Sequence, residues 1–132
     1  MKNVLDTNVL VSAIVFGGKP KDVIVGAVES GDVIYISTFV ERELRRVLKE
    51  KFHFREEQLS DVKRFVEDAF IKTEPTSLPE IIKRDPSDNN ILALAVGAAA
   101  DYIVSGDNDL LELGSYQSIP ILTPDQFLES TG

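Results

Sequence analysis

The amino-acid sequence predicts an α/β fold in which helices cover both faces of a central parallel β-sheet. Short apolar segments rich in β-branched residues alternate along the chain with longer segments of helical periodicity. Strands that alternate with helices usually form a parallel sheet buried on both faces. The chain has 132 residues, 43% of them hydrophobic, which suffices for one core. We therefore expect residues 1–132 to form a single three-layer α/β/α domain.

The first half of the chain contains two strand-like segments and four helix-like segments. Asn3–Leu5 is short, apolar and followed at once by Asp6, and residues 33–37 have the composition of a buried strand. Apolar side chains recur at helical spacing in the segments between and after them. We expect strands over 3–5 and 33–37, and helices over 9–15, 21–29, 39–52 and 56–70, with a glycine-rich turn at 17–20.

The second half begins with a proline-rich stretch and then returns to alternating elements. Residues 72–85 are expected to form a crossing loop, with a short strand near 71–73. Asp85 and Pro86 have the composition of an N-cap and a first helical residue. Pro120 suggests that the last strand lies at a sheet edge. We expect helices over 86–100, 107–113 and 124–128, and strands over 102–105 and 119–122.

Charge and composition exclude several classes of protein. The net charge of −8 argues against a generic nucleic-acid binder. Six carboxylates and no base lie between residues 85 and 112, whereas six bases lie between 42 and 55. There is no cysteine, so a disulfide framework and a thiolate zinc site are both excluded. No signal peptide or membrane-spanning segment is recognisable, so we expect a soluble, cytoplasmic protein.

Three aspartates are predicted to meet at one edge of the sheet. Asp6 follows the first strand, Asp107 follows the strand over 102–105, and Asp88 lies in the first turn of the helix between them. Ligands of such sheets bind beyond the carboxyl ends of the strands. Carboxylates brought together repel one another unless they share a proton or a cation. Mg²⁺ or Mn²⁺, which prefer oxygen ligands, are the expected occupants.

Each of these aspartates also has a purely structural interpretation. Asp6 and Asp88 are suited to helix N-termini, where carboxylates are favoured. Asp107, with Asn108 and Asp109, has the composition of a turn. Asp101 precedes a strand and is expected at the opposite edge of the sheet, away from any site.

Two glutamates on the helix over 39–52 border its apolar stripe. Thr38 and Glu41 match a capping box, which gives Glu41 a structural role. Glu43 has no such role and is therefore the fourth candidate acid. The bases around it could hold a nucleic-acid backbone through phosphate contacts. These bases are Arg42, Arg45 and Arg46.

Four motifs in this order resemble those of PIN domains over essentially the whole chain. They are Asp6-Thr7-Asn8, Glu43-Leu44, Asp85-Pro86-Ser87-Asp88 and Ser105-Gly106-Asp107-Asn108-Asp109. The resemblance implies an endoribonuclease, often the VapC-type toxin of a toxin–antitoxin pair, usually a homodimer held by its antitoxin. It also implies that the four acids Asp6, Glu43, Asp88 and Asp107 are catalytic and hold the metal. Asn8 and Ser105 would then support them by hydrogen bonds, and Asp109 would be a supporting or alternate ligand. Gly106 departs from many such toxins, in which Arg is common at this position.

Two other functions remain open from the sequence. A non-catalytic PIN-like module would bind RNA or a protein partner without cleaving it. A phospho-acceptor signalling domain also gathers acids at strand ends, but it needs a lysine at the end of a late strand, and residues 121–124 supply none. If the chain is the nuclease, one or two divalent ions would activate water for attack on phosphorus. The products would then carry 5′-phosphate and 3′-hydroxyl ends, because water rather than a ribose hydroxyl attacks.

Overall fold

A mostly parallel sheet forms the centre of the protein. The computed structural model describes residues 1–79 and 87–131, and the strands of this part lie in the order β3-β2-β1-β4-β6-β5. Every neighbouring pair is parallel except β5 and β6. The strands are β1 (Lys2–Leu5), β2 (Val33–Ile36), β3 (Ile71–Lys72), β4 (Tyr102–Val104), β5 (Ser115–Tyr116) and β6 (Ile119–Leu122).

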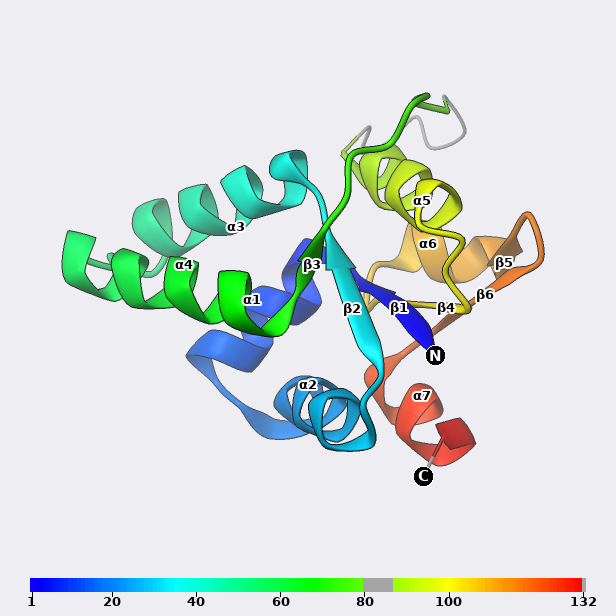
Figure 1. Ribbon diagram of the computed structural model, residues 1–132, viewed down its shortest axis with the longest axis horizontal. Coiled ribbons are helices and arrows are strands. Elements are labelled where there is room, and N and C mark those ends of the chain that lie inside the picture. The colour runs from blue at the N-terminus through cyan, green and yellow to red at the C-terminus, as the bar shows by residue number, and fades with distance from the viewer. Residues whose placement is uncertain (80–86, 132) are drawn as a thin grey trace.

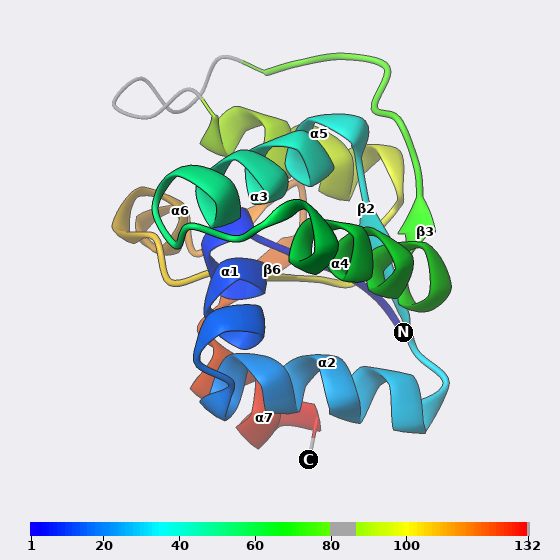
Figure 2. The same cartoon turned by 90° about the vertical axis from the view of Figure 1, so that its left-hand side faces the viewer.

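Helices cover both faces of this sheet, which confirms the predicted three-layer α/β/α architecture (Figure 1). In Figures 1 and 2, α2 and α7 lie below the sheet, and α3 and α5 lie above it. Helix α1 packs against both α2 and α3. The helices are α1 (Thr7–Val15), α2 (Gly18–Ser30), α3 (Thr38–Glu50), α4 (Glu56–Ala69), α5 (Asp88–Gly97), α6 (Asn108–Leu113) and α7 (Pro124–Thr131).

The core forms where the central strands meet α5. Val4, Ile103 and Val104 are fully buried, as expected for parallel strands covered on both faces. All side chains from Ile91 to Ala95 are buried too, because α5 packs on β1 and β2 with one side and on α3 with another. Burying each large apolar side chain stabilises the fold by roughly 1.5–3 kcal/mol. The first residue of α5, Asp88, is thereby held against the rigid centre of the sheet.

Helix α2 begins three residues earlier than predicted. The sequence suggested that the turn at 17–20 separates the helices, with the second starting at Lys21. The chain instead turns at Gly17, whose φ of 78° favours glycine, and the helix starts at Gly18. Pro20 therefore lies in the first helical turn. Its missing N–H is harmless there, because the first N–H groups of a helix have no intrahelical acceptor.

The prediction that the last strand lies at an edge is wrong. Strand β6 lies between β4 and the two-residue strand β5, which the sequence did not reveal. Pro120 is tolerated because the pairing of β6 with β4 begins at Ile121, so the missing N–H removes no bond from that ladder.

Helix α5 is shorter than predicted. It ends at Gly97 rather than near residue 100, because Ala99 adopts a φ of 52° and the N–H of Ala100 donates to the carbonyl of Ala95 at 2.9 Å. The described helix begins at Asp88. The predicted N-cap Asp85 and first helical residue Pro86 lie outside the described residues.

The predicted capping box of α3 is also wrong. Ser37 is the N-cap, and its hydroxyl accepts a hydrogen bond from the N–H of Val40 at 3.2 Å. Thr38 is the first helical residue, and both its N–H and its hydroxyl donate to Glu74. Glu41 pairs with Lys72 of β3 at 3.3 Å instead of capping the helix. Its role is structural, as expected, but through a different contact.

In the part of the chain that the structure describes, no helix combines the length and the apolar character needed to cross a bilayer.

Asn3 is a polar residue in the middle of the core. It is 0% exposed, and neither its amide nitrogen nor its amide oxygen has a hydrogen-bond partner among the described residues. A buried amide without partners costs about 1–3 kcal/mol. We predict that Asn3→Leu, which has a similar shape, raises the free energy of unfolding by this amount. Urea denaturation would measure it, and a lower midpoint for the variant would contradict the prediction.

Candidate metal centre

The centre is built at the carboxyl ends of β1 and β4. These strands are paired with Leu5 opposite Val104, and the N–H of Asp6 donates to the carbonyl of Val104 at 2.9 Å. Asp6 and Ser105, which are 99 positions apart in the sequence, therefore leave the sheet side by side. The Ser105 hydroxyl donates to Asp6 Oδ2 at 2.9 Å and accepts from the N–H of Asp107 at the same distance. Ser105 thus links the two acids, and it is fully buried.

Asp107 caps α6 with one oxygen of its carboxylate. Oδ1 accepts hydrogen bonds from the N–H groups of Asp109 at 2.9 Å and Leu110 at 3.1 Å. The structural interpretation of Asp107 is therefore correct as far as it goes. It leaves Oδ2 for another ligand, so capping and metal binding do not exclude each other.

Three carboxylates converge closely at this edge. Asp88, Asp107 and Asp109 each contribute an oxygen, and these oxygens lie within 4.8 Å of one another. Asp88 is 4% exposed at the start of α5, whereas the other two are half-buried. The resemblance drawn from the sequence gave Asp109 the role of a supporting or alternate ligand. Its place in this acidic cluster follows from the first turn of α6, where the bonds to Asp107 hold its backbone.

Asp6 lies beside the acidic cluster and has an altered pKa. Burial raises the pKa of Asp6 from 3.8 to about 6. The Ser105 hydroxyl and the backbone N–H of Asn8 lower this pKa, while the negative charges of Asp107 and Glu43 raise it further. Five acids from the end of β1, α3, α5 and the β4–α6 segment thus influence one another or lie in the same cluster: Asp6, Glu43, Asp88, Asp107 and Asp109.

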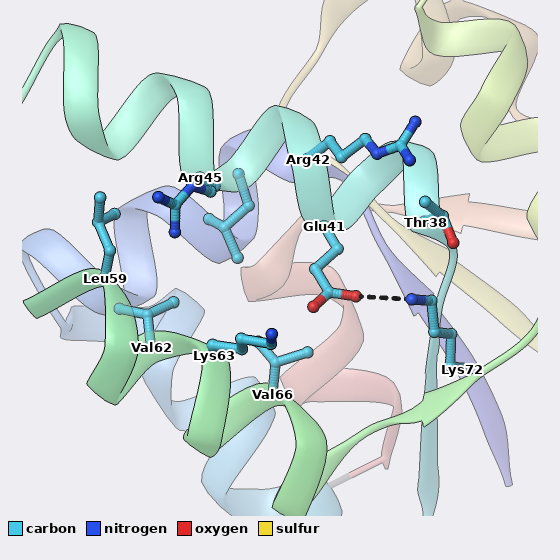
Figure 3. A pocket seen from close by; sticks show the side chains of 10 residues that line it. Thr38, Glu41, Arg42, Arg45, Leu59, Val62, Lys63, Val66 and Lys72 are labelled. Atoms are coloured by element: carbon cyan, nitrogen blue, oxygen red, sulfur yellow. Dashed lines mark ion pairs between the residues drawn. The ribbon is translucent and has the colours of Figure 1, made fainter. Parts of the chain in front are cut away.

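Glu43 and Glu41 border the buried side of α3 from opposite directions. At 100° per residue the two are 200° apart on the helix. Figure 3 shows that Glu41 points to Lys72. Glu43 lies on the other border, and its negative charge raises the pKa of Asp6. This separation places Glu43, and not Glu41, on the side of α3 from which a carboxylate affects Asp6, which the sequence alone could not decide by geometry.

The three arginines of α3 do not all lie on the same surface of the protein. Arg42 and Arg45 line a hollow of about 390 Å³ between α3 and α4, with Leu59 and Val62 opposite (Figure 3). Arg45 also pairs with Glu56 at 3.2 Å.

Arg46 lies one turn after Glu43, on the same side of the helix. It pairs with Glu50 at 3.2 Å. By position, Arg46 is better placed than Arg45 to meet a ligand of the acids.

Two residues of the first motif complete the description. Asn8 is exposed in the first turn of α1. Thr7 is 2% exposed, and its hydroxyl has no hydrogen-bond partner among the described residues. A buried hydroxyl without a partner is costly, and a bound group next to Asp6 would satisfy it. The sequence did not single out Thr7, because threonine is common in the first turn of helices.

The donor set fits a hard divalent cation. The cluster offers carboxylate oxygens from three aspartates, and no histidine or cysteine takes part. Mg²⁺ and Mn²⁺ prefer such oxygen ligands. Asp88, Asp107 and Asp109 could hold the ion, with Asp6 and Glu43 close enough to respond to its charge.

Comparisons with known proteins relate this arrangement to a protein family and to a solved structure. The model of the PIN-domain family matches residues 2–109. The fold is similar to a chain in the crystal structure of VapBC2 from Rickettsia felis bound to a DNA fragment from their promoter. The TM-score is 0.68 at 18% sequence identity, over 92% of this chain and 97% of that chain. No curated protein matches the sequence.

The fold and the acidic edge define an α/β domain of the kind that binds ligands beyond its strand ends. The chain belongs to the PIN-domain family, since the match includes Asp6, Glu43 and the whole acidic cluster. The resemblance drawn from the four motifs is therefore confirmed.

Substitution of Asp6 tests the electrostatics of the centre. As the pH rises from about 4 to about 6, an unfolded chain loses the Asp6 proton before the folded protein does, which lowers stability. Asp6→Asn lacks this penalty. We predict that it is more stable than the wild type above about pH 6, by up to about 3 kcal/mol, and that the difference shrinks below about pH 4.

Thermal unfolding in EDTA at several pH values would measure this effect. Asp61→Asn is a suitable control, because Asp61 is an exposed acid on α4. An Asp6→Asn variant whose advantage is independent of pH would contradict the assigned cause.

Proposed function

We propose that the protein is a metal-dependent endoribonuclease that hydrolyses phosphodiester bonds in RNA. The observation that carries the proposal is the acidic cluster, in which three carboxylate oxygens lie within 4.8 Å of one another. Carboxylates this close repel one another, and a bound cation between them would relieve that repulsion. Membership of the PIN-domain family supports the nuclease interpretation over other uses of a cation.

In this proposal Asp88, Asp107 and Asp109 hold Mg²⁺ or Mn²⁺, and Asp6 and Glu43 complete the catalytic acids. The chemistry that such an ion supplies when bound is activation of water and stabilisation of charge on the phosphate. Ser105 keeps Asp6 and Asp107 in place through its two hydrogen bonds. The capping bonds to Asp107 Oδ1 fix the direction of its other oxygen.

Arg42 and Arg46 are proposed to contact phosphates of the substrate beside the acids, and Asn8 to orient groups near Asp6. Arg45 was expected to act with them. Arg45 lies two residues from Glu43, or about 200° around α3, and it pairs with Glu56 at 3.2 Å, so it has less access to the same phosphates.

Replacing Asp107 by Asn tests the catalytic role without removing the helix cap, because Asn and Asp cap helices equally well. We predict that Asp107→Asn lowers Mn²⁺-dependent cleavage of single-stranded RNA at least about 100-fold, more than loss of an outer-shell partner usually costs. Its melting temperature in EDTA should stay close to that of the wild type. Gel analysis of labelled RNA, with Asp61→Asn as the control, measures this.

Three outcomes would count against the proposal. Full activity of Asp107→Asn would exclude Asp107 as a catalytic acid. Cleavage that persists in EDTA would exclude a requirement for a metal ion. RNA binding without any cleavage would favour a non-catalytic PIN-like module instead. A parallel assay on single-stranded DNA decides whether the substrate is RNA alone, because the described site contains no evident reader of the ribose 2′-hydroxyl.

We further propose that the chain is the toxin of a toxin–antitoxin pair, active in the cytoplasm as a homodimer and held by an antitoxin. The order of the four motifs and the fold shared with a chain of VapBC2 support this role. A toxin that degrades cellular RNA stops growth when it is produced without its antitoxin.

Production of the protein alone in a bacterial host tests the toxin role. We predict growth arrest with the wild type and normal growth with Asp107→Asn produced at the same level. Co-production of a small protein from the neighbouring reading frame should restore growth. Normal growth with an active wild-type enzyme would instead indicate a housekeeping nuclease.

A further inference from the structure

A small pocket adjoins the acidic centre and has no role in the account above. It measures about 290 Å³ and opens between the starts of α1, α2 and α7 and the segment that precedes α6. It is lined by Asn8, Val9, Ser12, Pro20, Gly106 and Pro124. Gly106 directly precedes Asp107, and Asn8 is two residues after Asp6. A ligand in this pocket would therefore lie next to the acids.

Gly106 is not required by the fold. Its φ lies outside the positive range that favours glycine, and a Cβ atom built on it meets no heavy atom within 4 Å. Glycine at such a position has a cost, because it gives the unfolded chain extra conformational freedom. A Cβ atom at this position would therefore enter open space, and Gly106 is one of the residues that line the pocket.

The chemistry of the walls indicates what the pocket takes. Val9, Pro20 and Pro124 give the pocket apolar walls, while Asn8 and Ser12 offer an amide and a hydroxyl. Small-ligand sites typically combine apolar walls with a few polar groups that fix orientation. A nucleobase matches this pattern, since it has apolar faces and a hydrogen-bonding edge.

A phosphate matches the pocket poorly. No Lys or Arg is among its lining residues. The two bases that flank Pro20, Lys19 and Lys21, are both exposed and neither lines the pocket, and Lys19 pairs with Asp125 at 3.8 Å.

We propose that this pocket binds the base of a nucleotide next to the scissile phosphate, and that Gly106 keeps the pocket open for it. The proposal rests on the nuclease function argued above and adds to it a subsite that recognises a base. Gly106 is thus a determinant of substrate recognition and takes no part in the chemistry.

The test uses Gly106→Leu, which fills the pocket, and Gly106→Ala, which fills it less. Gly26→Leu is the matched control, because a Cβ atom on Gly26 in α2 also meets open space and this residue does not line the pocket. The substrates are a single-stranded RNA that the wild type cuts once, and copies of it with one base removed at each position flanking the cut. Calorimetric titration with Mn²⁺ shows whether the metal centre is intact.

For Gly106→Leu we expect a kcat/KM lowered roughly tenfold or more on the intact RNA, mainly through KM. The Mn²⁺ affinity of this variant should be unchanged. The kcat/KM of Gly106→Ala should fall less, and that of Gly26→Leu should equal the value of the wild type. Removing the base at one flanking position should lower the kcat/KM of the wild type by a similar factor. The same change in the RNA should leave the kcat/KM of Gly106→Leu unaffected. This pattern is expected only if the side chain and the base compete for the same space.

The proposal is overturned if Gly106→Leu cleaves the intact RNA as well as the wild type does, or if no single base removal affects the wild type. Failure of the nuclease function is distinguishable. If the wild type cleaves no RNA, binding of the same RNAs is measured by fluorescence anisotropy in EDTA. Base-dependent binding that Gly106→Leu loses would then support the subsite alone, whereas equal binding by both proteins would overturn it as well.

Discussion

The convergence of carboxylates at one edge of the sheet, one of them deeply buried, is the constraint on which the rest of this structure depends. Asp88, Asp107 and Asp109 bring oxygens within 4.8 Å of one another, and Asp6 is buried beside them. Water does not reach Asp6 well enough to stabilise its charge, so burial raises its pKa to about 6. The folded chain bears this cost, and a divalent cation would remove it. The burial of Asp6 beside these acids therefore accounts for its raised pKa and supports its proposed part in the chemistry.

The rest of the fold supplies the rigidity that holds these charges together. Parallel pairing of β1 with β4 fixes the relative positions of Asp6 and Ser105, and the buried helix α5 fixes Asp88. Ser105 joins the two strand ends with one hydroxyl that donates to one acid and accepts from the backbone of another. Structural and functional roles are combined rather than separated here, since Asp107 caps α6 with one oxygen and leaves the other for a ligand.

The fold and the principal acids were predictable from the sequence, because strand ends in a parallel sheet determine where a site forms. Features that depend on tertiary context were not. Strand β5 has only two residues, Ser115 and Tyr116, which carry no hydrophobic pattern. The end of α5 depends on a positive φ at Ala99, where no glycine marks it. The sequence separated Glu41 from Glu43 through a capping box that does not form, whereas the contact of Glu41 with Lys72 depends on the position of β3. The place of Asp109 in the cluster depends on the turn that Asp107 caps.

Location of a bound cation is the most direct test of this account. Crystals grown with Mn²⁺ would give anomalous scattering at each site that the ion occupies. The account predicts a peak in direct contact with carboxylate oxygens of Asp107 and Asp88, with Asp109 or Asp6 as a further neighbour, and movement of these side chains toward the ion. A Mn²⁺-saturated protein with no peak among these aspartates would contradict it.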